Sequence, residues 1–157
     1  MGHQTLIYKE KVLASLEESY IHLQRLDEAL AYLMTKYHFP LHTDTFQQIT
    51  ESSMDLAYSD QIIYRFSKLQ DTMGAKLFRA LLLYQGENIN RPFLDLLNRL
   101  ESMDIIDVDN WFEIRDLRNI IAHDYDADSE TTVEVLNKIY AIRNDLRHIL
   151  DAIQKLV

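Results

Sequence analysis

The sequence predicts an all-α protein, built from about five helices in a single domain over residues 1–157. Apolar residues recur at steps of three and four along most of the chain, which is the period of a helix with one buried face. The chain has only three glycines and two prolines, fewer than is usual for a loop-rich or β-rich fold of this length. No stretch alternates apolar and polar residues as a half-buried strand does.

A long first helix is predicted from about Gln4 to Tyr37. Its apolar residues follow one helical face: Leu6, Leu13, Leu16, Tyr20, Leu23, Leu30 and Leu33. Pro40 ends this region because proline disfavours helix in the residue before it. His38 and His42 flank that proline, so they do not stand together on a helix, and we expect a surface loop there rather than a metal site.

A second helix is predicted from about Thr45, with weak points at 52–53 and 58–60 where it can break or bend. A stronger pattern resumes at Asp60 and runs to Tyr84. Gly74 lies inside this third helix, where glycine costs about 1 kcal/mol relative to alanine. A close approach by another helix would explain the glycine.

Three further helical segments complete the predicted bundle. A short helix has Pro92 in its first turn, where the missing N–H is harmless. The next helix ends at His123, and Asn110 with Glu113 fits a capping box at its start. A last amphipathic helix follows, capped by Asp128 or Ser129.

The formal net charge of −9 is concentrated in one part of the chain. Residues 101–134 hold eleven acidic side chains and two basic ones, Arg115 and Arg118, whereas the charges of the remainder balance. This acidic segment disfavours general binding of phosphates and suits docking on a basic protein surface. A shorter strip around Asp71 is basic, and its cations are Arg65, Lys68, Lys76 and Arg79. It is either an RNA-facing surface or a solvated helix face.

Several classes of protein are disfavoured by what the sequence lacks. It has no cysteine, which excludes disulfides and thiol catalysis and fits a reducing compartment. The longest apolar run, Ala80–Tyr84, is far too short to span a bilayer, and the N-terminus does not resemble a signal peptide. We therefore expect a cytoplasmic protein without a membrane partner. No glycine-rich phosphate loop or metal-ligand cluster stands out, so no cofactor or metal is expected.

Residues 111–128 concentrate phosphate-binding and proton-transferring side chains. Arg115, Asn119 and His123 stand four apart and share one face of the predicted helix. Arg118 precedes His123 by five residues, which is about 140° around a helix axis. A straight helix therefore does not aim both side chains at one small group. Either the long arginine stem reaches around, or a two-fold dimer brings Arg118 of one chain to His123 of the other.

The spacing Arg-x4-His occurs twice, at Arg118–His123 and at Arg143–His148. The second copy lies inside the predicted C-terminal helix, and neither a loop nor a tyrosine follows it. We interpret it as solvated helix surface. The first copy is followed by Tyr125 in an acidic loop, and it is the candidate for a functional site.

The eight residues from Arg118 to Tyr125 read RNIIAHDY. They resemble the Arg-x4-His-x-Tyr signature of HEPN domains as found in HepT-like toxins, and Asn119 is also typical of that family. The resemblance implies an up-and-down helical bundle that forms a homodimer and acts as a metal-independent endoribonuclease on RNA. It also implies a partner, a minimal nucleotidyltransferase that serves as antitoxin of the two-gene module. By the same resemblance, this partner would transfer AMP to Tyr125.

Metal-independent RNA cleavage needs one group that moves a proton and one that holds the phosphate, because the ribose 2′-OH is the nucleophile. His123 suits the first role and Arg118 the second, since histidines titrate near neutral pH and arginine binds phosphate through two N–H groups. Asn119 and Arg115 would support them. Two alternatives remain: a non-enzymatic HEPN protein that binds or regulates a nucleotidyltransferase, which the acidic segment favours, and a helical interaction module with no connection to nucleotides.

Overall fold

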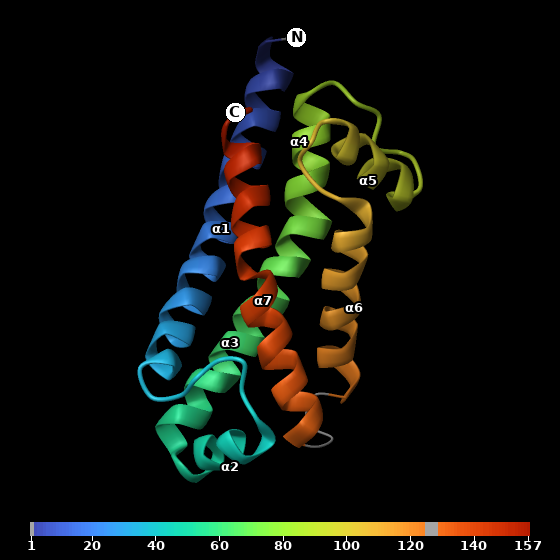
Figure 1. Cartoon of the computed structure of the whole chain (residues 1–157). Helices are drawn as coiled ribbons and strands as arrows, with labels where there is room; N and C mark the ends of the chain where they lie inside the picture. Colours follow the sequence, from blue (N-terminus) through green and yellow to red (C-terminus); the bar gives the residue numbers. More distant parts are fainter. Residues whose placement is uncertain (1, 125–128) are drawn as a thin grey trace.

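The computed structural model describes residues 2–124 and 129–157 (Figure 1), and every regular element within these ranges is helical. The predicted all-α fold is therefore confirmed. The elements are α1 (Gly2–Met34), α2 (Thr43–Glu51), α3 (Ser53–Thr72), the π-helical stretch η1 (Met73–Leu77), α4 (Phe78–Tyr84), α5 (Phe93–Ser102), α6 (Val108–Asp124) and α7 (Ser129–Gln154). None of the described helices is both long enough and apolar enough to cross a membrane.

Four long rods run alternately down and up the molecule in Figure 1. They are α1, the end-to-end series α3–η1–α4, α6 and α7. The α3–η1–α4 series is the central rod, because α1, α6 and α7 all pack against α3. The short helices α2 and α5 lie at opposite ends of the bundle and pack on α3 and α4 respectively. If the central rod is counted once, the described residues form six helices, one for each of the six helical segments predicted from the sequence.

The second predicted helix breaks at only one of its two weak points. Ser52 has an extended backbone (φ −110°, ψ 116°), and its hydroxyl accepts a hydrogen bond from the backbone N–H of Asp55, which caps α3. The chain stays helical through 58–60, where Ser59 is buried against the rest of the bundle. Helix α3 therefore begins at Ser53, earlier than predicted.

A buried carboxylate ties the end of α1 to α3. Asp55 is fully buried and accepts hydrogen bonds from the ammonium of Lys36 and the hydroxyls of Tyr37 and Tyr32. The Lys36 ammonium, together with these hydroxyls, holds the pKa of Asp55 below its usual range. All three donors come from the last turns of α1 or the chain just after it, so the cluster positions this corner of the bundle rather than the candidate site.

Helix α6 is anchored to the central rod by Trp111, which is 1% exposed. Its indole ring meets the ring of Phe78 edge-on, with 4.7 Å between ring centroids. A Cβ atom at Gly74 would lie 3.3 Å from Cζ2 of Trp111, so glycine is what allows the two helices to approach so closely. The close contact expected at Gly74 is confirmed.

The start of α6 differs from the prediction. The helix begins at Val108, and the carboxylate of Asp107 accepts a hydrogen bond of 2.9 Å from the backbone N–H of Asn110. Asn110 is thus the third helical residue and not the cap, so the predicted capping box with Glu113 is wrong. The carboxylate of Glu101 accepts from the N–H of Val108 at 2.7 Å, which satisfies a second orphan donor of the first turn.

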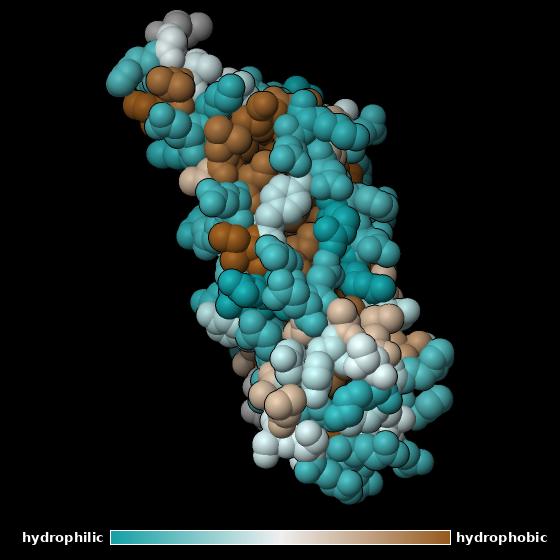
Figure 2. All heavy atoms as spheres, turned by 90° about the vertical axis from the view of Figure 1, so that its left-hand side faces the viewer, coloured by the Kyte–Doolittle hydropathy of each residue, from teal (hydrophilic) through white to brown (hydrophobic). Residues whose placement is uncertain are grey.

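The face on the α1 side of the bundle exposes several apolar side chains among polar ones (Figure 2). The exposed large apolar residues of α1 are Leu6, Ile7, Leu13, Ile21 and Met34. Helix α6 lies on the other side of the bundle in Figure 1, so this apolar surface does not contribute to the candidate site.

Candidate functional site

Helix α6 carries four of the five residues expected to form the site. The buried residues that set its rotation against α3 and α7 are Trp111, Ile114, Leu117 and Ile121. Their burial leaves Arg115, Asn119 and His123 exposed, as their four-residue spacing predicts, and Arg118 half-buried. Tyr125, the proposed modification site, lies outside the described residues.

Arg118 is held by a two-pronged ion pair with Asp71 of α3. Its Nε donates to Oδ1 of Asp71 at 3.0 Å, and its Nη2 donates to Oδ2 at 3.1 Å. The Arg118 side chain is 27% exposed and that of Asp71 is 45% exposed, so the pair lies at the rim of the bundle. Paired, planar geometry of this kind fixes the orientation of the guanidinium. The described residues provide no hydrogen-bond partner for Nη1.

His123 lies in the last turn of α6 with its side chain exposed. Arg118 and His123 are both described, and no hydrogen bond joins their side chains. Arg118 is paired with Asp71 of α3 instead.

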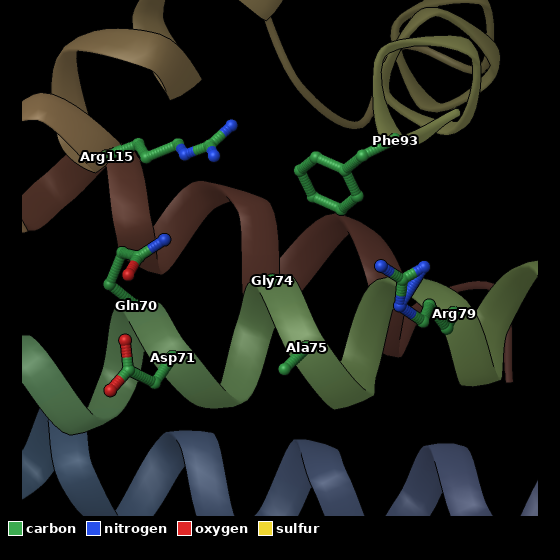
Figure 3. A pocket seen from close by; sticks show the side chains of 7 residues that line it. All are labelled: Gln70, Asp71, Gly74, Ala75, Arg79, Phe93 and Arg115. Atoms are coloured by element: carbon green, nitrogen blue, oxygen red, sulfur yellow. The ribbon is translucent and has the colours of Figure 1, made fainter.

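A pocket of about 370 Å³ adjoins the Arg118–Asp71 pair (Figure 3). It lies between the central rod, α5 and α6, and its lining residues are Gln70, Asp71, Gly74, Ala75, Arg79, Phe93 and Arg115. In Figure 3 the guanidinium groups of Arg115 and Arg79 lie at opposite ends, with the Phe93 ring between them. The guanidinium carbon of Arg79 is 5.2 Å from the centroid of that ring.

The basic strip on the central rod is divided among several environments. Lys76 forms an ion pair of 3.3 Å with Glu18 of α1, and Arg65 contacts His22 of α1 at 3.1 Å. Lys68 lies over the ring of Tyr64. Arg79 is the member of the strip that lines the pocket beside α6. The strip is therefore not a single surface.

The second Arg-x4-His copy lies on α7 and has a different environment. Arg143 donates to the backbone carbonyl of Tyr140 and stacks on its ring, with 4.1 Å from guanidinium carbon to ring centroid. His148 is exposed on the same helix. Among the described residues no carboxylate orients Arg143 as Asp71 orients Arg118.

Three residues of this region were not assigned a site role from the sequence. Asp71 is the single acid of the basic strip, and nothing in the local sequence marks Gln70 or Phe93 as part of a site. Asp71 is 47 residues from Arg118 along the chain, so the pairing depends on how α3 packs against α6. No local motif marks such a partner.

The described residues contain no group of three or more His, Cys, Asp or Glu side chains arranged to hold a metal ion. The region contains a small pocket lined by Arg79 of α4 and Arg115 of α6, and α6 also carries the exposed His123 in its last turn. Such groups can bind an anion and transfer a proton. The sequence matches no family model, no curated protein and no solved structure.

Proposed function

We propose that this protein is a metal-independent endoribonuclease of the HepT-like kind, the toxin of a two-gene module whose antitoxin is a minimal nucleotidyltransferase. The observation that carries the proposal is the fixed guanidinium of Arg118, held by Asp71 beside an arginine-lined pocket on the helix that ends with the exposed His123. The RNIIAHDY octapeptide supports it independently. The all-helical bundle is compatible with this function but does not specify it.

The chemistry requires few protein groups. The ribose 2′-oxygen attacks the adjacent phosphorus as His123 removes its proton, and the bond from phosphorus to the 5′-oxygen breaks. The departing 5′-oxygen takes a proton from solvent, which leaves a 2′,3′-cyclic phosphate and a 5′-hydroxyl. Arg118 binds the phosphate and offsets the charge that develops in the transition state. Asn119, which is exposed between Arg115 and His123 on α6, donates to a phosphate oxygen or orients the imidazole.

The active unit is proposed to be a two-fold dimer in which Arg118 of one chain and His123 of the other form each site. The supporting observation is that Arg118 turns to α3 while His123 is exposed in the last turn of α6. We expect equal mixing of Arg118→Ala and His123→Ala chains to restore about a quarter of native activity, because half the dimers are mixed and each contains one intact site.

The mixing experiment needs a control for subunit exchange, such as differently tagged chains recovered together. Either variant incubated alone should stay inactive. A mixture that exchanges subunits and stays inactive would contradict the composite site. Full activity from a protein that is monomeric at micromolar concentration would contradict the dimer itself.

Tyr125 is proposed as the control point. Its hydroxyl oxygen would attack the α-phosphorus of ATP in the partner nucleotidyltransferase, and pyrophosphate would leave as AMP becomes attached. The added phosphodiester charge, two residues beyond His123, would occupy the phosphate position and repel RNA. We expect intact-mass spectrometry after co-expression to show AMP increments on the native chain and none on Tyr125→Phe, which should keep its nuclease activity. An unmodified but fully inhibited complex would instead indicate blocking by the partner alone.

A non-enzymatic role as a nucleotidyltransferase-binding protein is the second candidate. It is favoured by a groove of about 470 Å³ between α6 and α7, where half-buried Ile120 and Ile142 lie beside exposed Glu113, Asp116 and Lys138. An apolar groove whose rim carries more acidic than basic side chains suits a basic, partly apolar protein surface. Under this proposal the complex forms, and the isolated chain does not cleave RNA.

Growth on induced expression tests the leading proposal against this alternative. We expect the native chain to arrest growth and the His123→Ala chain to leave growth unaffected at equal protein level. Arrest by both chains alike would refute the nuclease role of His123. A nucleotidyltransferase gene adjacent to this one would further distinguish both proposals from an interaction module unrelated to nucleotides.

A further inference from the structure

The pocket lined by Gln70, Gly74, Ala75, Arg79, Phe93 and Arg115 is a candidate ligand site in its own right. We propose that it binds one nucleotide of a single-stranded RNA, with the base stacked on Phe93 and the backbone phosphates held by Arg79 and Arg115. This inference rests on the proposed function, since it places the RNA strand beside the residues that would cleave it.

The charge of the pocket is the first argument. The chain as a whole is acidic, and residues 101–134 contain only two bases, Arg115 and Arg118. Arg115 lines the pocket, and Arg118 binds Asp71, the one acid in its lining. Neither Arg115 nor Arg79 has an ion-pair partner among the described residues. Two arginines without an ion-pair partner therefore face a shared hollow in a protein of net negative charge, which favours a specific anion over general nucleic-acid binding.

The shape of the pocket is the second argument. Gly74, which has no side chain, and Ala75, which has only a methyl group, line the pocket where it meets the π-helical stretch η1. Single π-turns within α-helices occur frequently at functional sites. The buried ring of Trp111 packs against Gly74 at this point. A hollow of about 370 Å³ suits a single extruded nucleotide and not a duplex, which proteins bind along its grooves.

The kinds of side chain are the third argument. Phe93 is half-buried, and its ring lies between the two guanidinium groups in Figure 3. A positively charged groove combined with aromatic side chains holds single-stranded bases without sequence preference, because the charges bind the backbone and the rings stack on the bases. Gln70 is 8% exposed, and its amide has no hydrogen-bond partner among the described residues, which leaves it able to bond a base edge.

The pocket also lies within reach of the proposed cleavage groups along α6. Arg115 and His123 are eight residues apart on α6, which is about 12 Å along the helix axis. Asn119 is exposed midway between them. A short oligonucleotide that enters the pocket at Arg115 can therefore follow the exposed face of α6 to His123.

Binding of a fluorescein-labelled RNA hexamer by full-length protein, measured by anisotropy, tests the proposal. The His123→Ala chain serves as the background so that the RNA stays intact. We expect Phe93→Leu to weaken binding roughly 10-fold and Phe93→Tyr to preserve it, since a base stacks on either ring. Arg79→Gln should weaken binding and make the log–log salt dependence shallower by about 0.7. Arg25→Gln, which alters an exposed arginine of α1, should bind as the background does.

Equal binding by the background, Phe93→Leu and Arg79→Gln, with folding verified by thermal melts, would overturn the proposal, as would the absence of RNA binding. Displacement of the hexamer by AMP at the same nucleotide concentration would show a mononucleotide site and would overturn the claim for a strand. The experiments distinguish failure of the proposed nuclease function from failure of the pocket proposal. A native chain that never cleaves RNA, while Phe93→Leu still weakens binding, would refute the nuclease and leave the pocket assignment intact.

Discussion

Alanine at Arg118 or at His123 is expected to reduce RNA cleavage by about 10²- to 10⁴-fold, the usual effect of removing a positioned proton-transfer group or charge stabiliser. Arg118 is fixed by its ion pair with Asp71, and His123 is exposed at the end of α6. Neither side chain fills the core, so the thermal unfolding midpoint should change little in either variant. Initial cleavage rates on a labelled RNA, together with melting curves, measure both effects.

The second Arg-x4-His copy provides the matched control. Arg143→Ala and His148→Ala make the same chemical changes on α7, where Arg143 stacks on Tyr140. We expect both control variants to cleave RNA at nearly the native rate. Loss of activity from these variants, with activity retained in Arg118→Ala and His123→Ala, would mean that the α7 copy is the site.

Trp111→Ala is expected to lower the free energy of unfolding by about 3–5 kcal/mol, as removal of a large buried aromatic side chain usually does. Trp111 is 1% exposed, meets Phe78 edge-on and fills the space beside Gly74. The surrounding helices cannot close that space without moving α6 against the central rod. Urea denaturation, monitored by circular dichroism, gives the free energy of unfolding of each variant.

The control for Trp111→Ala is Leu94→Ala, which shortens a large apolar side chain that is 48% exposed. We expect Leu94→Ala to change the free energy of unfolding by no more than about 0.5 kcal/mol. If Trp111→Ala were as mild as this control, α6 would not depend on Trp111 for its position. The close packing of α6 against Gly74 would then need another explanation.

Helix identity was predictable because apolar periodicity directly reflects which face is buried. The close helix–helix contact at Gly74 was also predictable, because a glycine inside a strong helix pattern indicates a close neighbour. Trp111 is that neighbour. Helix starts were less predictable. Several side chains near residue 110 can accept a hydrogen bond from the first turn of a helix. In the structure Asp107 accepts it.

The candidate site was predictable only where it is local in sequence. Arg115, Asn119 and His123 follow from helical spacing and are exposed as expected. The groups that complete the region come from other helices: Asp71 from α3 and Phe93 from α5. Their contribution depends on tertiary packing, and a single sequence contains no signal for contacts of that kind.

The ends of the RNA fragments test the central claim most directly. Purified protein is incubated with a defined single-stranded RNA in the presence of EDTA, and the fragments are identified by mass spectrometry. The proposed chemistry predicts 2′,3′-cyclic phosphate and 5′-hydroxyl ends from the native chain and intact RNA from His123→Ala. Intact RNA with the native chain, or fragments with 3′-hydroxyl and 5′-phosphate ends, would contradict it.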